Sequence, residues 1–292
     1  TTGTANVAVG AEALDANTTA DSNTAVGYAS LSDNTTGASN TALGRAALGN
    51  NTTASDNTGI GFLALGLNTT GAKNVAVGSN SLDANTTGQF NTAVGYDALT
   101  SNVSGVSNVA VGTYALLTNT ANQNTAVGVT ALQLNTSGTA NTGIGFQTLV
   151  QNTTASNNTA VGNNALVVNT TGAGNVAVGS AALDANTTAS NNTAVGYHSL
   201  SANTTGTGNV AVGTEAFRDN TTGSFSTAVG SLSLFESTTG SGNTALGRRA
   251  LQENTTASDN TGVGIEALRY NTTGAQNTSV GATALKQNTT AN

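Results

Sequence analysis

The stretch from Asn23 to Ser39, NTAVGYASLSDNTTGAS, decides the fold, because the rest of the chain repeats it. Counting its first asparagine as position 1, the consensus is N-T-A-V-G-x-x-A-L-x-x-N-T-T-G-x-x. The copies are 17 residues long, except for one of 16 residues that begins at Asn108. No linker interrupts them, so we expect residues 1–292 to form a single repeat domain. The repeats start at residues 6, 23, 40, 57, 74, 91, 108, 124, 141, 158, 175, 192, 209, 226, 243, 260 and 277.

Each repeat predicts one short strand and one turn. Thr-Ala-Val-Gly alternates small and β-branched side chains with a period of two, which is typical of a strand. Asn-Thr-Thr-Gly predicts the turn, because Asn and Gly tolerate positive φ. Helix pairs need about 33 residues or more per repeat. The pattern therefore predicts an all-β fold, a single-chain parallel β-solenoid with cross-β stacking and 17 circuits of about 17 residues.

Disorder is the competing structural interpretation, because Asn, Thr, Ser and Gly dominate and charged residues are few. A disordered chain has no physical reason to keep an aliphatic side chain at position 4 of every copy. Position 9 is equally constant, with leucine everywhere except Phe217. We therefore expect a packed wall on one side of each circuit.

Positions 4 and 9 are the expected core, because identical positions lie above one another in a stacked solenoid. If the side chain at position 4 faces inward, the residue at position 2 shares its face, whereas positions 3 and 5 face outward. The expected core residues include Val26, Leu31, Val94, Leu99, Val127, Leu132, Val195 and Leu200.

Glycine occupies position 5 in every copy. With alanine at position 3 it would leave a nearly bare face that another sheet or subunit could approach closely. The alternative is that glycine only relieves a bend in the circuit. The close-approach candidates include Gly27, Gly95, Gly128 and Gly196.

Two asparagine columns are expected to form amide ladders, at positions 1 and 12. The position 12 asparagine also begins an N-x-[ST] tripeptide in all copies except those with Asn119 and Ser237, so it is a candidate glycan acceptor. Turn and ladder chemistry explains the same motif, and sugars about 4.8 Å apart would collide. The ladder or glycan-turn residues include Asn17, Asn34, Asn68, Asn85, Asn152, Asn203 and Asn271.

The composition excludes several kinds of chemistry. Cysteine is absent, His198 is the single histidine, and the acids are scattered singly over variable positions, so we expect no catalytic site, cofactor or metal. A net charge of −7 has the wrong sign for nucleic-acid binding. The longest apolar stretch, residues 59–67, is far shorter than the ~20 residues that cross a bilayer, so no membrane insertion is expected.

Position 6 carries a partial row of aromatic residues. A row of this kind suits sugar stacking or lateral contact, whereas isolated surface aromatics are the plainer interpretation. Its members are Tyr28, Phe62, Tyr96, Phe146 and Tyr197.

The N-T-A-V-G-x-x-A-L motif, as in NTAVGYDAL from Asn91 to Leu99, resembles the β-roll head repeats of trimeric autotransporter adhesins. It is also similar to the tandem NTAVG…NTTG repeats of phage tail-fibre and bacterial surface proteins. The circuits of the adhesin heads are somewhat shorter than the 17-residue circuit of this chain. The resemblance implies a non-enzymatic structural role on a cell or virion surface.

The leading functional hypothesis is a subunit of an extracellular filament assembled by head-to-tail stacking of solenoids. Thr1 and Asn292 fall in the same turn of the repeat, so copies would stack with their columns almost in phase. The expected partners are copies of the chain itself, end-to-end, lateral or trimeric, with covalent glycans as a further candidate. The alternatives are a rod segment of a trimeric adhesin or phage tail fibre, and an ice-binding protein with flat threonine rows.

Overall fold

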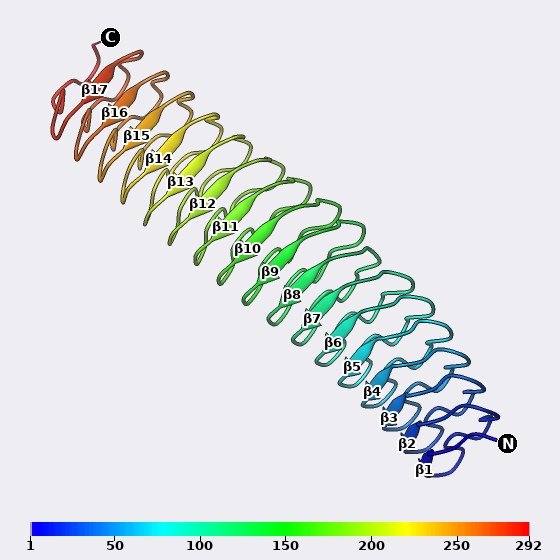
Figure 1. Cartoon of the computed structure of the whole chain (residues 1–292). Helices are drawn as coiled ribbons and strands as arrows, with labels where there is room; N and C mark the ends of the chain where they lie inside the picture. The colour runs from blue at the N-terminus through cyan, green and yellow to red at the C-terminus, as the bar shows by residue number, and fades with distance from the viewer. Residues whose placement is uncertain (1, 292) are drawn as a thin grey trace. The chain divides into compact units, whose positions relative to one another are not determined.

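The structure is a computed structural model that describes residues 2–291, and β-strands are its regular secondary structure. Its internal contacts divide the chain into two units, residues 2–141 and 142–291, which are described separately. Each unit is a parallel β-solenoid (Figure 1). The predicted all-β solenoid class is therefore confirmed, whereas the single repeat domain over residues 1–292 stays a prediction.

Every strand covers positions 2 to 4 of its repeat. In the first unit these are β1 (Val7–Val9), β2 (Thr24–Val26), β3 (Thr41–Leu43), β4 (Thr58–Ile60), β5 (Val75–Val77), β6 (Thr92–Val94), β7 (Val109–Val111) and β8 (Thr125–Val127). In the second unit they are β9 (Thr142–Ile144), β10 (Thr159–Val161), β11 (Val176–Val178), β12 (Thr193–Val195), β13 (Val210–Val212), β14 (Thr227–Val229), β15 (Thr244–Leu246), β16 (Thr261–Val263) and β17 (Thr278–Val280).

Neighbouring strands of each unit pair in parallel and in register with the repeat. In the first unit Ala25 lies beside Ala42, and in the second Ala160 lies beside Ala177. The 16-residue copy keeps this register, since Val109 pairs with Thr125. Its missing residue is therefore absorbed in the turn, and like positions stay above like positions.

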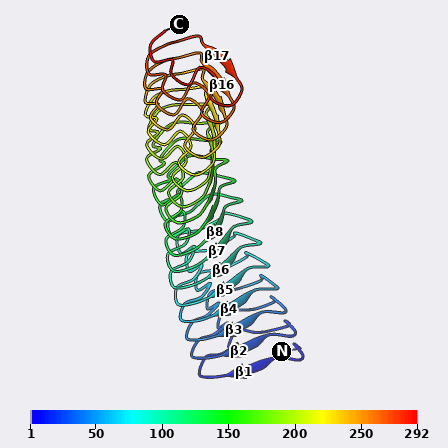
Figure 2. The same cartoon turned by 90° about the vertical axis from the view of Figure 1, so that its left-hand side faces the viewer.

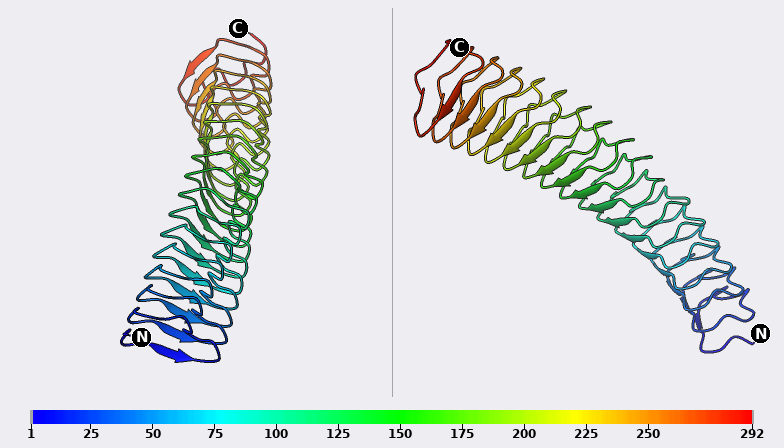
Figure 3. Two further views of the ribbon diagram at one scale, coloured as in Figure 1. Left: turned by 90° about the vertical axis from the view of Figure 1, so that its right-hand side faces the viewer. Right: turned by 45° about the horizontal axis from the view of Figure 1, so that its top comes forward.

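Hydrogen bonds between circuits extend well beyond the three-residue strands. The amide of Leu31 donates to the carbonyl of Ala47 at 3.0 Å, and that of Thr35 donates to Thr52 at 2.8 Å. In each unit the strands form one flank of the coil and the turn segments form the rest (Figures 2 and 3). The turns are thus part of the ladder, which satisfies the backbone groups of a chain with very little strand.

The backbone turns inward through left-handed conformations at positions 5, 7, 9 and 17. Gly27, Ala29, Leu31 and Ser39 show the pattern, with φ of 136°, 53°, 50° and 59°. Such values are uncommon for residues with a side chain. A buried leucine in this conformation recurs in circuit after circuit, so the stacking contacts must outweigh its strain.

No helix within residues 2–291 has the length and apolar character needed to cross a membrane.

Candidate assembly and interaction surfaces

The leucine column at position 9 is the centre of the core. Leu31, Leu99, Leu132 and Leu200 are fully buried, and Phe217 takes the same place in its own circuit. The leucine half of the expected core thus lies where the repeat predicts it.

The valine half of that expectation is wrong. Val26, Val94, Val127 and Val195 are only half-buried, because positions 2 and 4 face outward. The alanine at position 3, such as Ala25, is the strand residue that faces the interior and is fully buried. The interior is narrow, and a leucine opposite a small side chain fills it without overpacking.

The leucine of one circuit packs against position 3 of the next. A Cβ placed on Gly59 would lie 3.2 Å from Cγ of Leu48, and one on Gly262 would lie 3.3 Å from Cγ of Leu251. Both glycines stand where most circuits have alanine. The core is therefore built from a leucine knob and a small-residue hollow contributed by adjacent circuits.

Each position 5 glycine lies close to the position 5 glycine of the next circuit. This close approach runs along the stack and not toward another subunit. A Cβ on Gly27 would lie 2.6 Å from the carbonyl oxygen of Gly44, and one on Gly95 would lie 2.6 Å from that of Gly112. Gly128 and Gly196 have φ of 137° and 136°. The expectation of a bare Ala/Gly face open to another subunit is wrong, because the alanines point inward and the glycines contact one another.

The position 12 asparagines form a buried amide ladder. Nδ2 of Asn51 donates to Oδ1 of Asn34 at 2.9 Å and to the carbonyl of Ala54 at 2.9 Å. Asn68, Asn85, Asn203 and Asn271 repeat both bonds, and Asn34 donates to Asn17 over 3.4 Å. Asn152 donates to Ala155 and accepts from Asn169.

This geometry favours the ladder over the glycan interpretation. N-linked sugars attach through Nδ2. In Asn34, Asn68, Asn85, Asn203 and Asn271 that atom belongs to a fully buried side chain and already donates two hydrogen bonds. A sugar there would require the circuit to open.

The position 1 asparagines form a different column. Oδ1 of Asn23 accepts a hydrogen bond from the backbone amide of Asn40 at 2.9 Å, and Nδ2 of Asn23 donates to the carbonyl of Gly37 at 2.9 Å. Ser226 replaces this asparagine once, and its hydroxyl accepts from the amide of Asn243. The position 1 asparagine therefore bonds both to the backbone of its own circuit and to the backbone of the next circuit.

The threonines at position 13 also join circuits. The hydroxyl of Thr35 donates to the carbonyl of Thr52 at 3.0 Å, and the hydroxyl of Thr52 donates to Thr69. The position 13 hydroxyls are engaged within the ladder, which weakens the ice-binding interpretation for this one of the two threonine rows.

The position 12 ladder is interrupted at the two copies that depart from the consensus. In the 16-residue copy Asn119 donates to Ala121, and Oδ1 of Asn102 is left without a hydrogen bond among the described residues. At Ser237, the buried hydroxyl and Oδ1 of Asn220 are both without a partner in residues 2–291. Unsatisfied buried polar atoms of this kind cost about 1–3 kcal/mol each.

Replacing Ser237 with asparagine is expected to repair the second interruption. The new amide would donate to Oδ1 of Asn220 and to the carbonyl of Gly240, as Asn220 itself does one circuit earlier. We expect a gain of about 1–2 kcal/mol, seen as a higher midpoint of urea unfolding by circular dichroism. Thr239→Asn, at an exposed position of the same circuit, should change the midpoint little. An unchanged midpoint for Ser237→Asn would contradict the ladder.

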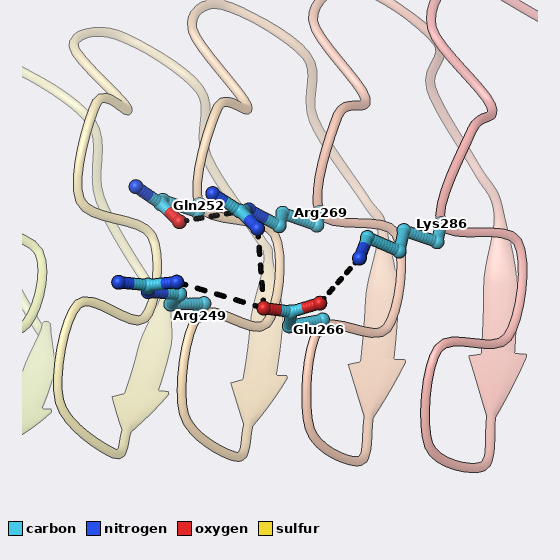
Figure 4. A network of polar contacts seen from close by, with 5 residues as sticks. All are labelled: Arg249, Gln252, Glu266, Arg269 and Lys286. Atoms are coloured by element: carbon cyan, nitrogen blue, oxygen red, sulfur yellow. Dashed lines mark hydrogen bonds and ion pairs between the residues drawn. The ribbon is translucent and has the colours of Figure 1, made fainter.

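Glu266 is the centre of a charged network on the outer surface of the second unit (Figure 4). Its carboxylate lies 3.1 Å from Nη1 of Arg269, 3.7 Å from Nη1 of Arg249 and 2.5 Å from Nζ of Lys286. The hydrogen bond from Lys286 is the main cause that holds the pKa of Glu266 below its usual value. The three cations come from three successive circuits, so the network ties these circuits together.

No group of three or more His, Asp or Glu side chains suited to a metal ion exists within residues 2–291. The ring of His198 packs edge-on against Tyr197, with centroids 4.2 Å apart. Burial raises the pKa of nearby Asp184, and His198 opposes part of that rise.

The aromatic residues at position 6 all lie on the outer surface, immediately after a strand and its glycine. Tyr28, Phe62, Tyr96, Phe146 and Tyr197 are each 42–52% exposed. Neither the core nor the ladders use them.

Comparison of the sequence with models of known protein families and with curated proteins finds no match. The function is therefore inferred from the geometry.

Proposed function

We propose that the chain is a non-enzymatic structural component of an extracellular filament in which copies stack circuit on circuit. The observation that supports this proposal is the way each circuit completes the one before it. A circuit supplies the small-residue hollow for the preceding leucine, as Gly59 does for Leu48. It also donates to the preceding asparagine, as Asn51 does to Asn34. Any circuit of this sequence can therefore continue the stack.

A joint between two copies would repeat the contact between circuits. A second copy stacked on β17 would set its Ala8 against Leu285, as Gly262 is set against Leu251 within the chain, and would pair its β1 with β17. Contacts between different surfaces of identical copies do not close, so they generate a fibre.

The composition supports an extracellular location. The chain holds no cysteine, methionine or tryptophan, so the side chains that oxidise most readily are missing. This resistance suits a protein that persists outside the cell.

A second candidate is the rod of a laterally associated, trimeric fibre, favoured by the outward strand face. Positions 2 and 4 carry only threonine, valine, leucine or isoleucine in all copies. Val75, Ile144, Val229 and Leu246 are among the exposed members of this strand face. Exposed valine, leucine and isoleucine side chains on the strand face suit protein–protein contact. The apolar strand face, not an Ala/Gly face, is then the surface that would be covered.

Electron microscopy and analytical ultracentrifugation of two variants test both candidates. Leu285→Lys would place a charge at the stacking contact, and Val94→Lys would place one on the strand face. We expect fibres from the unmodified chain and at least about tenfold higher critical concentration for Leu285→Lys, because the charge must be desolvated in the joint. Assembly blocked only by Val94→Lys would favour the lateral rod. An unmodified chain that stays monomeric at all concentrations would contradict both.

A further inference from the structure

Three aromatic rings of the first unit form a row with regular spacing. Tyr28, Phe62 and Tyr96 follow β2, β4 and β6, which alternate with β3 and β5 along the stack (Figure 1). All three occupy position 6 of in-register circuits, so they belong to one column. One circuit lies between neighbouring rings, so the rings are two circuit spacings, or about 9.6 Å, apart. The rings are 49%, 42% and 47% exposed.

The side chains between and beside the rings are polar. The circuit between the first two rings carries Arg45, whose guanidinium lies over the Phe62 ring, 5.5 Å from its centroid. Ser79 occupies position 6 between the last two rings. The row therefore alternates exposed aromatic surface with hydrogen-bonding groups.

Each tyrosine of the row also has a carboxylate beside it. A hydrogen bond to Glu12 is the main cause that raises the pKa of Tyr28. The charge of Asp97 raises the pKa of Tyr96, and Asn80 donates to Asp97 at 3.0 Å. Tyr114 packs edge-on against Tyr96, with centroids 5.6 Å apart, and restrains that ring.

We propose that this row binds an extended β-1,4-linked polysaccharide such as cellulose or chitin. Sugar rings carry apolar C–H faces that stack on aromatic rings, and a rim of hydroxyls that pairs with carboxylate, amide and guanidinium groups. In a β-1,4-linked chain alternate sugars are flipped, so the same face recurs every second sugar. That two-sugar repeat is close to the ~9.6 Å between the rings of the row. A coiled α-1,4-linked glucan lacks this alternation and does not present the same sugar face at this spacing.

Depletion of the purified chain by microcrystalline cellulose and by chitin tests the proposal, with starch granules as the control polymer. We expect binding to cellulose or chitin and not to starch. The triple variant Tyr28→Ala, Phe62→Ala, Tyr96→Ala should bind at least about tenfold more weakly, since each ring contributes to stacking. Phe90→Ala removes an equally exposed ring outside the row and should bind like the unmodified chain.

A ring exchange tests the spacing itself. The double variant Phe62→Ser, Ser79→Phe keeps the composition and moves the central ring by one circuit. We expect it to lose most of the affinity that the triple variant loses, while its circular dichroism spectrum stays unchanged. The proposal is overturned if the unmodified chain binds neither polymer, if the triple variant binds as tightly, or if the exchange has no effect.

Discussion

Leu99→Asp is expected to unfold the circuits around β6. Leu99 is fully buried, and the backbone amide of Leu99 donates to Ala115 of the next circuit at 2.9 Å. A carboxylate at this place would have no cation or hydrogen-bond donor within the leucine column. Burying it unpaired costs several kcal/mol, and the site also loses the contacts of a whole leucine side chain. Because each circuit is supported mainly by its neighbours, the damage should spread to the adjoining circuits first.

Limited proteolysis and hydrogen exchange of the variant measure this effect. New cleavage sites and fast exchange should appear between β5 and β7 and fade toward β1. Thr87→Asp is the matched control, because Thr87 is exposed in the neighbouring circuit and its substitution should change stability by less than about 0.5 kcal/mol. Unchanged proteolysis of Leu99→Asp would mean that position 9 does not hold the core.

The sequence predicts the stack well because its period is visible in every copy. The column at position 9 could be assigned because leucine there has no other role. The sequence does not determine which face of the strand points inward. A period of two places Ala25 and Val26 on opposite faces, but it does not show which of them is inside. Hydrophobicity alone favours the valine as the buried residue. The interior is already filled by Leu31, however, and leaves room only for the smaller alanine.

The left-handed backbone at positions 7 and 9 could not be predicted either. Alanine and leucine rarely adopt positive φ, so the residue types of Ala29 and Leu31 do not indicate a left-handed backbone. Position 17 does carry a signal, because Gly174 and Asn157 are residue types that tolerate this region. Local propensity is overruled at positions 7 and 9 by the gain from stacking identical circuits.

The two asparagine columns were predicted correctly in outline, but the bonding partners predicted for the position 1 column were wrong. Both were expected to bond amide to amide, but Asn23 bonds to the backbone of the next circuit and of its own turn. Position 12 forms the true amide ladder, as between Asn51 and Asn34. The two roles depend on side-chain direction, which spacing alone does not determine.

Gly95→Ala is the second substitution with a large expected effect, because two independent costs fall on one methyl group. Gly95 has φ of 139°, a region that residues with a Cβ avoid. The new Cβ would also lie 2.6 Å from the carbonyl oxygen of Gly112, and that carbonyl belongs to a stacked backbone that cannot move alone. Together these costs should destabilise the first unit by about 2–5 kcal/mol.

Urea unfolding of Gly95→Ala beside Gly59→Ala separates a positional effect from the general effect of losing a glycine. Gly59 occupies position 3, where most circuits have a buried alanine such as Ala42, and its added Cβ would lie 3.0 Å from the carbonyl oxygen of Ala64, so its substitution should cost much less than that of Gly95. If the two variants unfolded at the same urea concentration, glycine at position 5 would be a tolerated choice and not a steric requirement. A lower midpoint for Gly95→Ala alone would show that the distance between circuits is set by glycine backbones in contact, and that each repeat must keep one to remain stackable.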